Sequence, residues 1–130
     1  MATEGVKKAE EKKTTMVLGA SPKSHRYSYK AMAALQQHGH PVIAVASKES
    51  GAHGIPIQTD WPESGSVNTL SLYLNPSIQK PLYDKIIALK PKRIIFNPGS
   101  ENAELEAMAR EAGMKCVQAC TLVMLATGQF

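Results

Sequence analysis

Short, continuously apolar segments alternate along the chain with segments whose apolar residues recur at helical spacing. This alternation limits the possible folds more than any other feature, because strands that are apolar on both faces must be covered by helices on both sides. It predicts a three-layer, doubly wound α/β domain with a mostly parallel, five-stranded sheet and right-handed crossovers. The segments predicted as strands are 15–18, 41–46, 69–74, 93–96 and 115–119.

Helices are predicted between these strands. The first ends at Gly39, where a helix-ending glycine is common. The second spans 82–89, and the third spans 105–112. Residues 47–66 are rich in turn-forming pairs and contain only a short apolar piece at 55–57. Apolar residues near the end of the chain add one further C-terminal segment.

The length and composition indicate one soluble domain. The chain has 130 residues, of which 43% are hydrophobic and 20% are charged, as in ordinary globular proteins. We assign residues 1–14 to a flexible charged leader and residues 15–130 to the folded domain. No apolar run approaches the roughly 18 residues that cross a membrane, and the N-terminus lacks the apolar core of a secretory signal. These features predict a cytoplasmic protein without a membrane partner.

The net charge suits a small anionic ligand as well as it suits RNA, so the placement of the basic residues has to be considered. Fifteen Lys and Arg residues against eleven Asp and Glu residues give a net charge of +4. The basic residues are scattered along the chain, and only 5% of the residues are aromatic. Nucleic-acid-binding proteins more often cluster basic residues on one element or interleave them with aromatic ones. We therefore expect no nucleic-acid partner.

Ligands of doubly wound sheets bind beyond the carboxyl ends of the strands, where the first turn here reads Gly19-Ala20-Ser21. Glycine lets a ligand approach the backbone, and the free N–H groups of the following helix attract phosphate. The full G-x-G-x-x-G fingerprint is absent, so a plain tight turn explains these three residues equally well. The loop at 23–28 favours phosphate, because its hydroxyl and basic groups suit phosphate oxygens.

The end of the second predicted strand disfavours NAD. An NAD-binding domain carries an acidic residue there to hold the ribose hydroxyl, whereas this chain has Ser47-Lys48. A lysine pairs with a phosphorylated ribose, as found in coenzyme A (CoA) and NADP. Lys48 is otherwise explained as an ordinary surface charge.

Little in the sequence points to catalysis or to a metal site. Cys116 and Cys120 supply at most two ligands, and the four histidines have no metal-site spacing. Ser21 has no evident base, and no nucleophile elbow or phosphate-loop lysine is present. The sequence therefore predicts a protein that holds a ligand.

Five short motifs follow one another along the chain: VLGAS at 17–21, RYS at 26–28, HGH at 38–40, NPGSEN at 97–102 and ACTL at 119–122. Together they resemble the stand-alone CoA-binding domain proteins, which are similar to the CoA-binding Rossmann-like domain of the succinyl-CoA synthetase alpha subunit. The resemblance spans roughly residues 14 to 130. Many members have prolines where this chain has Ala44, Ala46 and Ser47.

The resemblance implies coenzyme A as the ligand and assigns positions to it. The CoA diphosphate would lie at the first turn and its adjoining loop, the ribose phosphate near the lysine after the second strand, and further turns would border the ligand. The synthetase's phosphohistidine belongs to a domain that this chain lacks, so ligase chemistry does not transfer. The implied binding residues are Gly19, Ala20, Ser21, Arg26, Tyr27, Ser28, Lys48, Asn75, Pro76, Asn97, Pro98 and Gly99.

The leading hypothesis is a small CoA-binding or acyl-CoA-binding protein without catalytic activity of its own. One alternative is an NADP-binding oxidoreductase-like protein, which would need a nicotinamide pocket. Another is a protein-interaction module that has lost the ligand, with an exposed loop at Trp61-Pro62 as its partner surface. Small sheet proteins of this kind often form dimers, so a homodimer is one further expectation.

Overall fold

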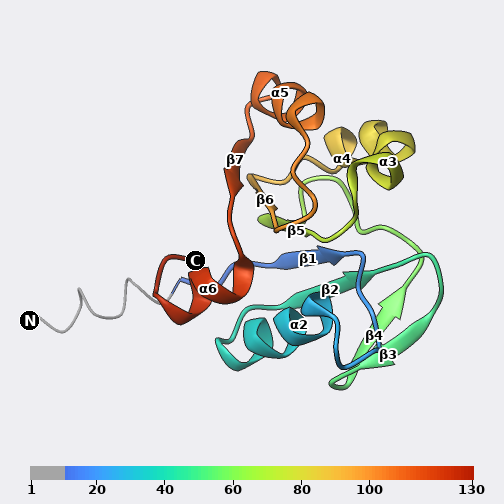
Figure 1. The fold of residues 1–130 in the computed structure, drawn as a ribbon, viewed down its shortest axis with the longest axis vertical. Coiled ribbons are helices and arrows are strands. Elements are labelled where there is room, and N and C mark those ends of the chain that lie inside the picture. Colours follow the sequence, from blue (N-terminus) through green and yellow to red (C-terminus); the bar gives the residue numbers. More distant parts are fainter. Residues whose placement is uncertain (1–10) are drawn as a thin grey trace, which may run out of the picture.

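The computed structural model describes residues 11–130, so the first ten residues of the predicted leader lie outside the described part. Its elements follow the predicted alternation (Figure 1). The strands are β1 (Thr15–Leu18), β2 (Val42–Val45), β3 (Ser50–Ala52), β4 (Ile55–Gln58), β5 (Thr69–Leu72), β6 (Arg93–Phe96) and β7 (Lys115–Gln118). The helices are α2 (Tyr27–Gln37), α3 (Pro76–Gln79), the 3-10 turn η1 (Lys80–Leu82), α4 (Tyr83–Leu89), α5 (Ala103–Glu111) and α6 (Thr121–Ala126).

The sheet has seven strands in the order β3-β4-β2-β1-β5-β6-β7, so the prediction of five strands is wrong. The five predicted strands pair in parallel at its centre and one edge. The two further strands extend the other edge, β4 parallel to β2 and β3 antiparallel to β4. The sequence signal for both strands is weak, because β4 contains Pro56 and β3 contains Gly51, and both residue types are unfavourable in strands. β3 and β4 therefore come from the segment 47–66 that was predicted to be rich in turns.

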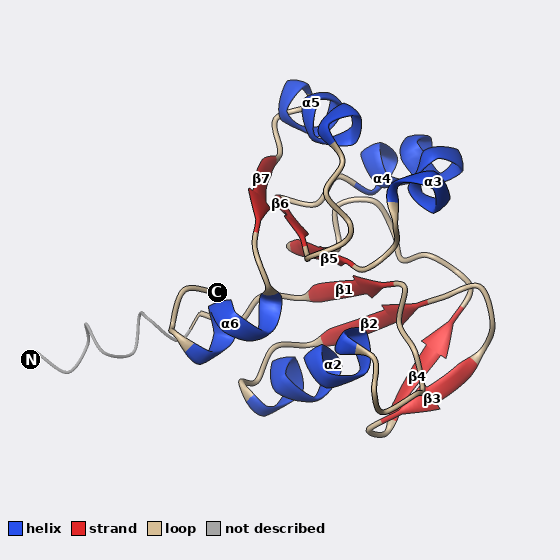
Figure 2. Cartoon of the chain, in the orientation of Figure 1, coloured by secondary structure: helices blue, strands red, loops and turns tan. Residues whose placement is uncertain are grey.

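Side chains of β1 alternate between two hydrophobic clusters. Met16 and Leu18 pack in a cluster that includes residues of α4 and α5, whereas Val17 packs with residues of α2 and α6. Figure 2 shows α2 and α6 together on one side of β1, and α3, α4 and α5 on the other. Within residues 11–130, no helix has the length and hydropathy needed to cross a membrane.

The helix ends follow from local chemistry. Lys90 adopts a left-handed conformation (φ 55°) directly after α4, and Pro91 follows it, so the helix stops where the proline predicted. The Asn102 side chain accepts a hydrogen bond from the backbone N–H of Leu105 at 3.1 Å and so caps the start of α5. The C-terminal apolar segment forms α6, whose Met124 and Leu125 are buried.

The strand order creates a crevice at the centre of the sheet. β1 lies between β2 and β5. The chain leaves β1 toward α2 on one side of the sheet and leaves β5 toward α3 and α4 on the other (Figure 1). Two loops that separate in this way leave a gap beyond the carboxyl ends of their strands. The ligand position predicted from the sequence is this gap beyond the carboxyl ends of the strands.

Candidate functional site

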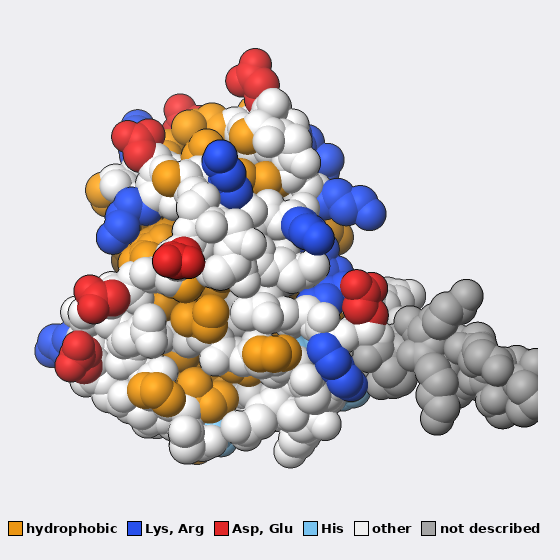
Figure 3. Space-filling model, turned by 180° about the vertical axis from the view of Figure 1, so that it is seen from behind, with side chains coloured by type: hydrophobic (Ala, Val, Ile, Leu, Met, Phe, Trp, Pro, Cys, Tyr) orange, Lys and Arg blue, Asp and Glu red, His pale blue; other side chains and the backbone are white. Residues whose placement is uncertain are grey.

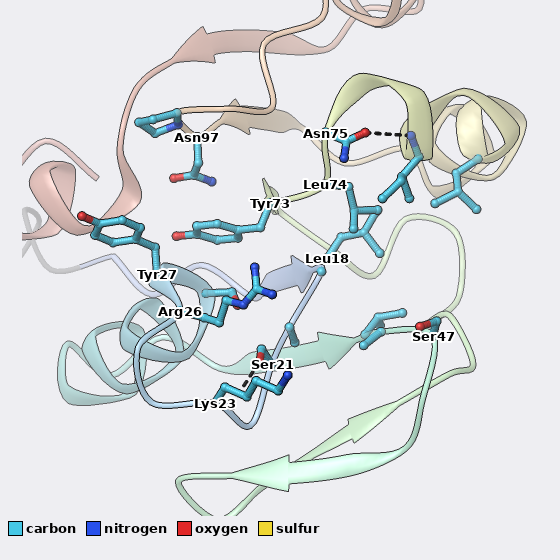
Figure 4. A pocket seen from close by; sticks show the side chains of 18 of the residues that line it. Leu18, Ser21, Lys23, Arg26, Tyr27, Ser47, Tyr73, Leu74, Asn75 and Asn97 are labelled. Atoms are coloured by element: carbon cyan, nitrogen blue, oxygen red, sulfur yellow. Dashed lines mark hydrogen bonds between the residues drawn. The ribbon is translucent and has the colours of Figure 1, made fainter.

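A cavity of about 1240 Å³ opens at this edge of the sheet. Its lining comes from the loops after β1, β2, β4, β5 and β6, together with the first turn of α2, α3, η1 and the start of α6 (Figure 4). Nine of the twelve predicted binding residues line it: Gly19, Ala20, Ser21, Arg26, Tyr27, Ser28, Asn75, Asn97 and Pro98. The other three, Lys48, Pro76 and Gly99, are exposed and are not part of the lining. Ser47, next to Lys48, does line the cavity.

The turn after β1 is shaped by its glycine. Gly19 has φ +93°, a conformation that favours glycine, and a Cβ atom there would lie 3.0 Å from Cδ2 of Leu74. The backbone N–H groups of Gly19 and Ala20 both donate to the carbonyl of Val45, at 3.0 and 3.2 Å. These two amides therefore hold the turn against β2, and free amides for a ligand must come from the residues that follow.

Replacing Gly19 with alanine is expected to lower the free energy of unfolding by about 2 kcal/mol, because a side chain is strained at this φ and crowds Leu74. Urea denaturation measures this loss. Gly99→Ala is the matched control: Gly99 has φ +95° with nothing within 4 Å of the added Cβ atom. It should cost about 1 kcal/mol from backbone strain alone. Equal losses in the two variants would contradict the role given to the Leu74 contact.

The first turn of α2 presents free backbone N–H groups to the cavity. No side chain of the described residues caps this helix, and its first turn contains no acidic residue. Tyr27 and Ser28, the first two residues of α2, line the cavity. The positive end of an uncapped helix attracts anions. This end of the cavity is therefore built to receive negative charge.

Basic side chains surround the same helix end. Lys23, His25 and Arg26 line the cavity and are exposed. In Figure 4 the side chain of Arg26 extends into the cavity, and Ser21 Oγ accepts a hydrogen bond from the backbone N–H of Lys23 at 3.1 Å. By contrast, on the face seen in Figure 3, basic and acidic side chains are interspersed. The basic groups at the cavity match the oxygens of a phosphate.

Asn75 and Asn97 line the cavity, and both side chains also form hydrogen bonds within the protein. Asn75 Oδ1 accepts hydrogen bonds from the backbone N–H of Ile78 at 3.1 Å and from Ser77 Oγ at 2.6 Å, and so caps α3. Asn97 is 1% exposed. Its Nδ2 donates to Ser71 Oγ and to the Leu72 carbonyl, both at 3.0 Å, and its Oδ1 accepts from the backbone N–H of Thr121 at 2.8 Å. Asn97 therefore shapes the cavity from behind its surface, whereas Asn75 is exposed in the lining.

A buried glutamine joins two loops of the cavity. Gln79 is 0% exposed, and its Nε2 donates to the carbonyls of Leu74 and Ser100 at 2.7 and 2.8 Å. Its Oε1 accepts from Nδ2 of Asn102 at 2.9 Å. The loop after β5 is thus tied to the loop after β6. Sequence reasoning missed this residue, because a single glutamine carries no signal of burial.

Tyr73 is another cavity residue that the sequence analysis did not single out. It follows β5, lines the cavity, and its buried hydroxyl has no hydrogen-bond partner within residues 11–130. Burial raises the pKa of Tyr73 to about 12, although the nearby hydroxyls of Ser71 and Thr121 act to lower it. The phenol is therefore neutral at physiological pH and can donate a hydrogen bond.

Exposed apolar side chains also line the cavity, and of these only Tyr27 was predicted. Tyr27, Ile78 and Val123 are the large exposed hydrophobic side chains of the described residues, and all three line the cavity. Trp61, predicted in an exposed loop, is instead half-buried against the core and lines the same cavity, with Nζ of Lys85 4.8 Å from its ring centroid. That expectation of an exposed loop is wrong for Trp61, because the indole packs against the core cluster that contains Ile86 and Leu89.

The reactive side chains are sparse in the cavity. Cys120, a free and half-buried thiol, lines it at the start of α6, and His25 is the one histidine in the lining. His53 contacts the carbonyl of Tyr29 at 2.9 Å instead. Among residues 11–130, no group of three or more His, Cys, Asp or Glu side chains is arranged to hold a metal ion.

Three solved structures are similar to the chain. A crystal structure of an uncharacterized protein has 46% sequence identity and a TM-score of 0.89, covering 92% of this chain and 99% of that one. A hypothetical protein from Pyrococcus horikoshii OT3 has 23% identity and a TM-score of 0.80, covering 98% and 92%. A protein from Thermus thermophilus has 20% identity and a TM-score of 0.78, covering 100% of both chains. The last two show a shared fold.

The family assignment rests on most of the folded domain. A family model described as a CoA binding domain matches residues 13–126, which include every strand and helix of the described part. This match agrees with the cavity at the carboxyl ends of the strands, its uncapped helix and its basic side chains. The chain belongs to the CoA-binding domain family.

Proposed function

We propose that the protein binds CoA or an acyl-CoA in the cavity, with the diphosphate at the start of α2 and the pantetheine arm along the apolar walls. The observation that carries this proposal is the uncapped first turn of α2, which opens on the cavity beside Lys23 and Arg26. A diphosphate placed there gains backbone N–H donors and charge-assisted hydrogen bonds together. Family membership supports CoA as the molecule that carries this diphosphate.

The ribose phosphate of CoA is assigned to the end of β2. Ser47 lines the cavity there, and the exposed side chain of Lys48 stands one residue beyond the lining. A lysine on a flexible stem reaches a phosphate at the rim without being part of the wall. Coenzyme A carries such a phosphate, whereas NAD does not, so this position favours CoA over NAD.

Exchanging Lys48 for glutamate is expected to weaken CoA binding about fivefold, because an exposed ion pair is replaced by repulsion. Binding of dephospho-CoA, which lacks the ribose phosphate, should not change. Titration calorimetry with both ligands measures the difference. Lys92→Glu makes the same charge change in an exposed residue just before β6, at the opposite end of the strands. Equal loss of both ligands in Lys48→Glu would contradict the assignment.

We further propose that the protein holds its ligand without converting it. Ser21 Oγ accepts a hydrogen bond from a backbone amide and has no histidine or carboxylate partner within residues 11–130. No hydrogen bond within those residues joins Cys120 Sγ to a histidine or carboxylate either, so neither nucleophile is paired with a base. A cytoplasmic location and pairing of two copies stay predictions.

Thermal unfolding with a panel of ligands tests the proposed function. CoA, acetyl-CoA, dephospho-CoA, NADP and NAD would be compared at equal concentrations. A ligand at a hundred times its dissociation constant adds about 2.7 kcal/mol to the stability, which is easily seen as a higher Tm. We expect CoA and acetyl-CoA to raise the Tm most. A larger rise with NADP would favour the oxidoreductase-like alternative, and no rise with any ligand would favour an interaction module.

A further inference from the structure

The hydroxyl of Tyr73 is a hydrogen-bond donor at the cavity that the protein itself leaves unused. The residue directly follows β5, and its backbone N–H donates to the Leu18 carbonyl at 2.9 Å, so its position at the centre of the sheet is fixed. Its side chain lines the cavity, and in Figure 4 the hydroxyl points toward Tyr27. That hydroxyl is buried and has no hydrogen-bond partner within residues 11–130.

Ser71 and Thr121 lie close enough to lower the pKa of Tyr73, but neither meets the distance and angle of a hydrogen bond to its hydroxyl. Ser71 Oγ and Thr121 Oγ1 form a hydrogen bond of 2.8 Å, and Asn97 Nδ2 donates to the same Ser71 oxygen at 3.0 Å. A buried donor without a partner is uncommon in folded proteins, because the group has lost water and gained nothing. Phenylalanine would fill the same space without this cost. A tyrosine at this position therefore suggests an acceptor that arrives with a ligand.

The surroundings of the hydroxyl suit a neutral acceptor. The side chains that influence its pKa are Ser71, Thr121 and Cys120, and no lysine or arginine is among them. Burial itself opposes negative charge at this point. No lysine or arginine acts on the pKa of this hydroxyl, although Arg26 lines the same cavity. A carbonyl oxygen needs only the one donor.

We propose that the Tyr73 hydroxyl donates a hydrogen bond to a carbonyl oxygen in the pantetheine arm of bound CoA or in the thioester of acyl-CoA. The inference rests on the proposed function and extends it, since the protein then recognises the neutral arm of its ligand as well as the phosphates. Tyr27 is 66% exposed and lines the same cavity. Exposed side chains change rotamer within picoseconds to nanoseconds, so a ligand can reach the hydroxyl without backbone movement.

Titration calorimetry of Tyr73→Phe with three probes tests this inference. CoA carries amide carbonyls, acetyl-CoA adds a thioester, and adenosine 3′-phosphate 5′-diphosphate keeps the phosphates without the arm. We expect CoA and acetyl-CoA to bind about tenfold more weakly than to the wild-type protein, with the phosphate-only probe unchanged. Loss confined to acetyl-CoA would also support the inference and identify the thioester as the acceptor.

Other outcomes overturn the inference and are distinct from failure of the proposed function. If the wild-type protein binds CoA and Tyr73→Phe binds it equally well, or if all three probes weaken equally, the hydroxyl does not recognise the arm. If the wild-type protein binds none of the probes, both proposals fail. Tyr29→Phe is the matched control, because Tyr29 lies in α2 but outside the cavity lining. It should leave all three affinities unchanged.

The stability of the ligand-free variant gives an independent readout. Removing an unpartnered buried hydroxyl should leave the Tm of the Tyr73→Phe protein unchanged or a few degrees higher. A lower Tm would mean that the hydroxyl already has a partner in the protein, and would overturn the premise. If Tyr73→Phe both raises the Tm and weakens CoA binding, the hydroxyl acts on the ligand, because loss of a purely structural hydroxyl would lower the Tm.

Discussion

Replacing Asn97 with alanine is expected to lower the free energy of unfolding by about 3 kcal/mol, or the Tm by roughly 10 °C. The side chain is buried and makes three hydrogen bonds, to Ser71, to the Leu72 carbonyl and from the backbone of Thr121. Its loss leaves the backbone N–H of Thr121 without a partner and removes one of the two hydrogen bonds at Ser71 Oγ and at the Leu72 carbonyl. Denaturant or thermal unfolding of the ligand-free variant measures the effect.

Asn75→Ala is the matched control for this prediction. Asn75 also borders the cavity, but it is exposed and its side chain only caps α3. Loss of such a cap costs about 1 kcal/mol. Losses of the same size in the two variants would contradict the view that Asn97 holds β5, β6 and α6 together. A larger loss for Asn97→Ala would show that Asn97, although it lines the cavity, acts mainly in stabilising the fold.

The second large effect is expected for ligand binding. Arg26→Glu should weaken CoA binding about 100-fold, because a charge-assisted hydrogen bond to the diphosphate is replaced by repulsion at the start of α2. The residue is exposed and precedes the first turn of the helix, so the fold should be unaffected. Calorimetric titration with CoA at one salt concentration measures the change, since salt screens exposed charges.

Lys92→Glu controls for net charge in this experiment too. Its side chain is exposed just before β6, so it lies away from the carboxyl ends of the strands. CoA affinity should be within about twofold of wild type in this control. A similar loss in both variants would mean that CoA responds to the overall charge of the protein. Such a result would remove the start of α2 as the diphosphate site.

The sequence predicted the central sheet because its strands are strongly patterned. Five apolar segments between helical segments correspond to β1, β2, β5, β6 and β7. β3 and β4 were missed because they are short, carry Gly51 and Pro56, and gain their order from pairing with β2 and with each other. Edge pairing is tertiary information that local pattern does not contain.

The position of the candidate site was predictable from topology, whereas the roles of its residues were not. The turn at Gly19 and the loop with Arg26 do line the cavity, as expected for the end of a first strand. Asn97 was predicted to face a ligand, yet its side chain is consumed by three internal hydrogen bonds. Tyr73 and Gln79 were missed, because their roles depend on the folded structure. The Tyr73 hydroxyl has no hydrogen-bond partner within residues 11–130, whereas Gln79 finds three.

Backbone amide NMR of the 14.1 kDa protein during a CoA titration tests the central claim most directly. We predict saturable shifts that are largest at 21–29, at the start of α2, with further shifts at 45–48 and 73–75. Amides near Gly39 and Gly113, at the opposite edge of the sheet, should stay unchanged. No saturable shift at millimolar CoA, or shifts centred on the opposite edge, would contradict the account.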